Sequence, residues 1–67
     1  MRWIEVPYAK VPKLKQLCNR KYYPVLRNHL MAPEPGGSYA FAKDGEGNIW
    51  FIDQHYPDEF KYYKMEI

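Results

Sequence analysis

Cysteine is almost absent from this chain of 67 residues: Cys18 stands alone, so no intramolecular disulfide can form. Small secreted domains usually depend on several disulfides, so that class is excluded, and a lone thiol suits a reducing cytoplasm. No apolar run approaches the roughly 18 residues that a membrane-spanning helix needs. Residues 1–5 lack the apolar centre of a signal peptide. We therefore expect a soluble cytoplasmic protein with no membrane partner.

Patterns that support catalysis or metal binding are also missing. Cys18, His29 and His55 match no zinc-ligand spacing. Asp53 stands two residues before His55, an arrangement that is common by chance and that lacks a third ligand. Residues 44–48 alternate oxygen-bearing side chains, but the glycine and glutamate of a calcium loop are absent from its sixth and twelfth positions. We expect no enzyme, no cofactor and no metal.

The short length limits the architecture to one domain, residues 1–67. Such a domain buries only about 60% of the surface that its unfolded chain exposes, which leaves little chain to wall a catalytic pocket. Hydrophobic residues make up 46% and charged residues 27%, which excludes intrinsic disorder. Aromatic residues reach 18%, and these rings must either fill the core or form a surface.

Charge is distributed unevenly along the chain. Residues 1–31 carry seven basic residues and one acid, residues 32–67 carry three basic residues and seven acids, and the net charge is +2. A basic first half can bind a phosphate-bearing or acidic partner. Because these cations do not form a single stripe around the predicted helix, a solvated surface is the alternative. The candidate phosphate-binding residues are Lys13, Lys15, Arg20, Lys21 and Arg27.

The first half of the chain predicts a strand followed by helices. Residues 2–6 are rich in strand-forming side chains. Pro12 suits the first turn of a helix, and apolar residues then recur at helical spacing, which predicts a helix over 12–22. Pro24 interrupts this helix and begins a second short one, which stops at Pro33. A single helix kinked at Pro24 is the alternative.

The second half of the chain predicts an antiparallel sheet. Residues 33–38 contain two prolines and two glycines and form a loop. Turn-rich stretches at 44–47 and 55–59 separate three expected strands, over 39–43, 48–54 and 60–67. The order β-α-(α)-β-β-β predicts an α+β domain with one helix layer on one face of the sheet.

Alternation along the strands divides the sheet into two faces. If Lys43 pairs with Ile49, one face carries two alanines that leave room for a helix backbone. This predicts a helix-packed core of Ala40, Ala42, Trp50, Ile52, Tyr63, Met65 and Ile67. The opposite face is then predicted to expose Tyr39, Phe41, Phe51, Phe60 and Tyr62.

An exposed aromatic face is typical of an interface. The sequence therefore predicts a non-enzymatic protein-binding module of the adaptor or inhibitor type, which docks through this face or a free strand edge. Phage and mobile elements encode many such small proteins. The alternative is single-stranded nucleic-acid binding, in which rings stack on bases and basic residues hold phosphates, although the acidic second half opposes it. A homodimer, or a purely structural aromatic ladder, also accounts for the face.

Overall fold

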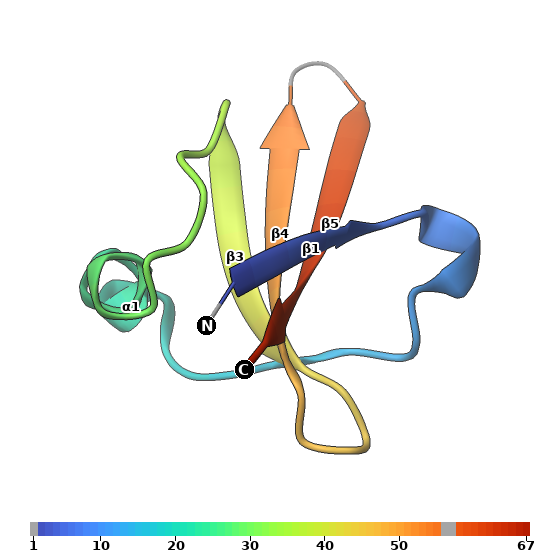
Figure 1. The fold of residues 1–67 in the computed structure, drawn as a ribbon. Coiled ribbons are helices and arrows are strands. Elements are labelled where there is room, and N and C mark those ends of the chain that lie inside the picture. The colour runs from blue at the N-terminus through green and yellow to red at the C-terminus, as the bar shows by residue number, and fades with distance from the viewer. Residues whose placement is uncertain (1, 56–57) are drawn as a thin grey trace.

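The computed structural model describes residues 2–55 and 58–67 and shows a five-stranded antiparallel sheet with one short α-helix (Figure 1). The strands are β1 (Arg2–Val6), β2 (Lys15–Gln16), β3 (Ser38–Lys43), β4 (Ile49–His55) and β5 (Glu59–Glu66). The helix α1 spans Tyr23–His29, and the 3-10 turns η1 and η2 span Tyr8–Lys10 and Arg20–Tyr22. The strand order is β1-β5-β4-β3-β2, so the first strand pairs with the last. The predicted α+β class is confirmed.

The β3–β4 hairpin is fixed by the carboxylate of Asp44. One of its oxygens accepts two backbone N–H groups of the turn, each at 2.9 Å. The other accepts the side-chain amide of Asn48 at 2.9 Å and the indole N–H of Trp50 at 3.0 Å. The turn places Lys43 opposite Ile49, and the predicted register is confirmed.

Asp44→Asn is expected to lower stability most at neutral pH. The hydrogen bond from Asn48, followed by that from Trp50, holds the pKa of the Asp44 carboxyl well below its usual value of 3.8. Because the folded pKa is depressed, this contribution is complete above the unfolded pKa and is lost as the pH falls below it. Urea unfolding should therefore show a stability gap between the two proteins that narrows in acid. A gap independent of pH would contradict the role of the ionised carboxylate.

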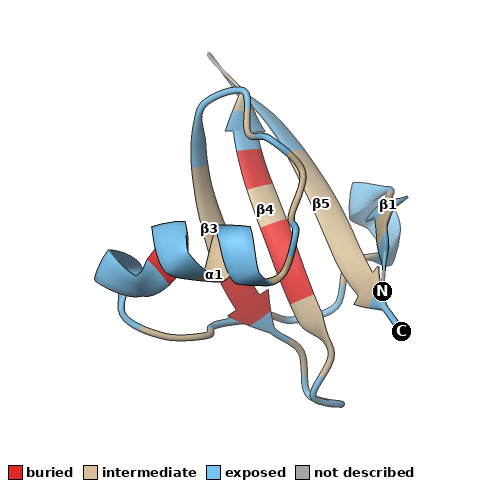
Figure 2. Ribbon diagram, turned by 60° about the vertical axis from the view of Figure 1, so that its left-hand side comes forward, coloured by how far each residue is buried: buried red, intermediate tan, exposed pale blue. Residues whose placement is uncertain are grey.

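The core is a cluster of aromatic side chains between the sheet and α1. Figure 2 shows its buried positions on β3, on β4 and near the start of the helix. Phe41 and Phe51 are both 0% exposed, with ring centroids 5.2 Å apart. Tyr23, at the start of α1, places its ring 5.6 Å from that of Phe41. β1 pairs with β5 as an edge strand, and from it the ring of Trp3 lies 6.0 Å from that of Phe51, while its indole N–H donates to the Leu30 carbonyl at 3.0 Å. The helix and the first strand thus close one core.

The predicted exposure of Phe41 and Phe51 is wrong, because α1 covers their face of the sheet rather than the alanine face. The predicted faces of the last strand are also wrong: Tyr63 pairs with Phe51, and Tyr62 lies on the opposite face. A domain this small has one core and fills it with its largest rings. The turn expected over 55–59 includes residues 56–57, which lie outside the described residues.

The predicted core is correct in part. Ala42 and Trp50 are buried, but on the face away from α1. Met65 pairs with Trp3 and so lies on the face that α1 and β1 cover. Ile67 follows the end of β5 and is fully exposed. The burial of the second face therefore comes from segments other than the helix.

The predicted helix over 12–22 is wrong. Residues 11–19 contain no helix: Lys15–Gln16 form β2 against the end of β3, and the Leu17 N–H donates to the Phe41 carbonyl at 3.0 Å. An isolated helix of about ten residues is marginal in water, whereas an open strand edge satisfies the same backbone groups. The second predicted helix is confirmed as α1, with Pro24 in its first turn. Within the described ranges, no helix is long and apolar enough to span a membrane.

Candidate functional site

A hollow of about 380 Å³ lies along β3, mainly over the sheet face turned away from α1, and it also reaches Tyr23 of α1. Its floor contains Ala40 and Ile52, which pair across β3 and β4. The single methyl group of an alanine between longer side chains leaves the surface recessed. We call this hollow the β3 groove; its lining includes Leu14, Arg20, Ala40, Ile52, Gln54 and Phe60.

The apolar surface continues from the β3 groove toward η1. An adjoining hollow of about 370 Å³ shares Leu14 and Ile52 with the groove and is also lined by Tyr8 and Tyr62. The rings of Tyr8 and Tyr62 lie 5.7 Å apart, and Tyr62 stacks on Phe60 at 6.3 Å. Phe60 is 49% exposed, so an apolar strip reaches the surface at the groove. A contiguous exposed strip of this kind is typical of a binding surface.

One margin of the β3 groove is an open strand edge. β2 pairs only with Lys43 and Ala42, at the far end of β3. The Phe41 carbonyl faces this edge, where it accepts the Leu17 N–H. Backbone groups two residues apart point the same way, so the N–H and C=O of Tyr39 also face the edge. In the described part of the chain, no strand pairs with residues 38–40 on this side.

Three of the five predicted phosphate-binding residues lie at this surface. Lys15 and Arg20 line the β3 groove, and Lys13 lines the adjoining hollow; no acidic residue of the described chain lines either one. Lys21 and Arg27 lie elsewhere, each over a tyrosine ring, at 5.1 and 6.0 Å. Lys13 and Lys15 lie on the extended segment of residues 11–19, and Arg20 follows it directly. A helix over 12–22 would have placed these three cations on different sides of its axis.

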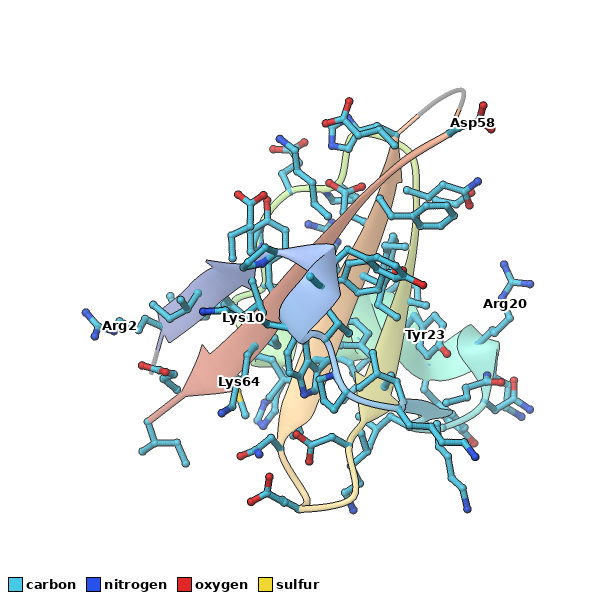
Figure 3. All side chains as sticks on the ribbon, turned by 90° about the vertical axis from the view of Figure 1, so that its right-hand side faces the viewer. Arg2, Lys10, Arg20, Tyr23, Asp58 and Lys64 are labelled. Atoms are coloured by element: carbon cyan, nitrogen blue, oxygen red, sulfur yellow. The ribbon has the colours of Figure 1, made fainter. Side chains whose placement is uncertain are left out.

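Arg20 lines more of the neighbouring hollows than Lys13 or Lys15 does. It lines the β3 groove and two further hollows beside it. Figure 3 shows its side chain extending from η2 away from the body of the molecule, on the side where Tyr23 also lies. An exposed guanidinium here can meet a carboxylate or a phosphate with two parallel hydrogen bonds.

The predicted partner-binding aromatics are divided between the core and this surface. Phe60 lines the β3 groove, and Tyr62 lines the adjoining hollow. Tyr39 borders the groove at the strand edge, while its ring packs 5.6 Å from Phe51. Phe41 and Phe51 cannot touch a partner in the folded protein, because both are fully buried.

Sequence reasoning missed the apolar groove residues Leu14, Ala40 and Ile52. The signal was present in the two alanines of β3, which indicate a recess in the sheet surface. The sequence predicts that a helix packs in that recess. The structure places α1 on the other face (Figure 2), and part of the recess stays open as the β3 groove.

Asp53 and His55 lie in contact, and the role of this contact is to hold the loop before β3. The Asp53 carboxylate is 2% exposed, accepts the Gly36 N–H at 3.1 and 3.2 Å, and lies 2.9 Å from Nε2 of His55. The contact ties the loop before β3 to β4. Among the described residues, no group of three or more metal-binding side chains occurs.

The chemistry of the β3 groove is that of binding: an apolar floor, an open hydrogen-bonding edge and cations at the margin. Comparison of the chain with protein-family models, with curated proteins and with solved structures found no match. The function must therefore be inferred from the geometry and charge of the groove.

Proposed function

We propose that this chain is a small, non-catalytic protein-binding module, of the adaptor or inhibitor type, that holds a segment of another protein in the β3 groove. The observation that carries the proposal is an apolar groove running alongside an unpaired strand edge. Grooves and strand edges of this kind are recurrent docking sites for protein segments. The groove, of about 380 Å³, has room for a few side chains rather than for a whole domain face.

Phe60 is the expected anchor of this interaction. Its ring is 49% exposed at the groove and is held in place by Tyr62, whose ring lies 6.3 Å away. A pre-positioned aromatic side chain loses little conformational entropy on binding, which is why such residues dominate interface energetics. The Ala40 and Ile52 floor beside it offers apolar area to the partner.

Affinity capture with immobilised variants tests the proposal. Phe60→Ala should retain at most about one tenth of the protein partner that the wild-type chain retains, because an aromatic anchor contributes at least about 1.4 kcal/mol. Val25→Ala is the control, since Val25 is 67% exposed on α1 and lines none of these hollows. Captured proteins are quantified by mass spectrometry. Equal capture by all three chains would place binding elsewhere and refute the proposal.

Single-stranded nucleic acid is the second candidate. It is favoured by one observation: the charged residues lining the β3 groove, within the described chain, are the cations Lys15 and Arg20. Rings on a sheet beside cations can stack bases and hold phosphates. Against it, Phe60 and Tyr62 already stack on each other at an interplanar angle of 26°, which leaves less ring face for bases. Asp58 and Glu59 also directly precede Phe60 and repel phosphate.

A further inference from the structure

We infer that the partner segment is an extended acidic strand that pairs with β3 at Ser38–Ala40 and lays alternate side chains in the β3 groove. This inference rests on the proposed function and adds to it the binding mode and the chemistry of the partner. Three observations carry it: the direction of the edge backbone, the space beside that edge, and the sign of the surrounding charge.

The backbone of β3 offers hydrogen bonds to an added strand. β2 leaves the edge after Leu17, which donates to Phe41. Tyr39 is two residues further along β3, so its N–H and C=O point outward at the position that a longer β2 would have occupied. An added strand satisfies both groups and extends the sheet beyond the point where the chain's own strand ends.

There is room for that strand. A hollow of about 350 Å³ lies between η2 and the β3 edge and is lined by Arg20, Tyr23, Pro24, Gly37, Ser38 and Tyr39. It shares Arg20, Tyr23, Ser38 and Tyr39 with the β3 groove. The edge is thus recessed on the groove side and on the η2 side, which is the shape that a chain passing along it requires.

The charge around the edge selects an acidic partner. Arg20 is exposed and lines both hollows, and Lys15 lines the groove. No acid lines either hollow in the ranges that the structure describes. Carboxylates of an added strand therefore meet cations of the opposite sign in both hollows.

The groove also fixes the expected pattern of the partner sequence. Successive side chains of a strand point to opposite faces of a sheet. One set lies over the apolar floor of Ala40 and Ile52 and beside Phe60, and we expect it to be apolar. The other set points to the opposite face, toward the hollow that Arg20 lines beside η2, and we expect it to be acidic. The partner is therefore a strand in which acidic and apolar residues alternate.

A synthetic probe tests this mode directly. The probe is a fluorescein-labelled, end-blocked heptapeptide in which glutamate and valine alternate, and its binding to the full chain is followed by anisotropy. A counterpart with lysine in place of glutamate tests the sign of charge. A second counterpart, N-methylated at alternate residues, lacks the backbone N–H groups that pair with β3. Each counterpart should bind at least about tenfold more weakly than the acidic probe, as loss of charge pairing or of main-chain hydrogen bonds implies.

Charge reversal supplies the matched protein variants. Arg20→Glu should weaken the acidic probe about tenfold or more and strengthen the lysine counterpart. Lys10→Glu changes the charge equally at an exposed residue of η1 that lines none of the hollows, and it should leave both affinities within about twofold. If both variants changed the two affinities equally, Arg20 would act only through the net charge of the protein. That result would overturn the proposal that the probe binds at the β3 edge.

The outcomes separate this inference from the proposed function. Equal binding of the N-methylated counterpart, or no preference for glutamate, overturns strand pairing, while capture lost by Phe60→Ala would still support a protein groove. Failure of the acidic probe to bind also overturns the inference. A labelled oligothymidylate that binds more tightly than the probe, with an affinity that falls steeply with salt, would replace both conclusions by the nucleic-acid function.

Discussion

Phe51→Ala is expected to lower the free energy of unfolding by about 3–5 kcal/mol, the usual cost of removing a buried phenyl ring and leaving a cavity. Phe51 is 0% exposed, and its ring lies 5.2 to 6.1 Å from those of Phe41, Tyr39, Trp3 and Tyr63. A domain of this size rarely has more than about 3–5 kcal/mol of stability from its core. The variant should therefore be largely unfolded at room temperature, as measured by urea titration followed by circular dichroism.

Phe60→Ala is the matched control for that measurement. It removes the same side chain from a neighbouring strand, but from a ring that is 49% exposed, so we expect a loss of about 1 kcal/mol or less. The sequence alone predicts that Phe51 and Phe60 share an exposed face, which implies similar small losses for both. Equal losses would restore that prediction and remove the structural basis of the β3 groove.

The parts of the fold that the sequence predicts correctly are those fixed by local chemistry. The Asp44 turn sets the β3–β4 register, because its carboxylate bonds four N–H groups within six residues. Pro24 stands in the first turn of α1, which its fixed φ suits. In both cases the deciding contacts lie within one turn of the chain, so their residue types carry the information.

The errors arise where distant contacts decide. Leu14 and Leu17 have helical spacing, but their segment follows the β3 edge because that edge needs partners for its backbone groups. The choice of sheet face likewise depends on where α1 and Trp3 pack, and no local pattern fixes either. Propensity is a weak prior when tertiary pairing offers an alternative of comparable energy.

The sequence predicts the kinds of residue that form the candidate site, but not that these residues lie together. Exposed aromatics, cations in the first half and a free strand edge are all expected from the sequence, and Phe60, Tyr62, Lys13, Lys15 and Arg20 do lie at the surface described. Their juxtaposition depends on the extended course of residues 11–19, which places Lys13 beside Tyr62 and Lys15 at the end of β3. The helix prediction dispersed those cations, and it therefore understated the electrostatic case for an acidic or phosphate-bearing partner.

Gly37→Ala is expected to destabilise the fold by about 1–3 kcal/mol, the range found when a group is forced into occupied space. A Cβ atom at Gly37 would overlap the backbone carbonyl oxygen of Gln54, which pairs across the sheet with Ser38. A backbone atom inside a strand cannot rotate away as the end of a side chain can. The start of β3 must therefore shift, and thermal unfolding should report a lower midpoint for the variant.

Gly45→Ala is the control for this second prediction, because a Cβ atom at Gly45 would meet nothing within 4 Å and the change should alter stability by less than about 1 kcal/mol. Equal losses of stability in the two variants would show that the contact with Gln54 is not what destabilises Gly37→Ala. Gly37 also lines the hollow between η2 and the β3 edge. A displaced β3 start moves Ser38 and Tyr39, so the folded fraction of Gly37→Ala should bind the acidic probe more weakly, whereas Gly45→Ala should bind it as the wild-type chain does.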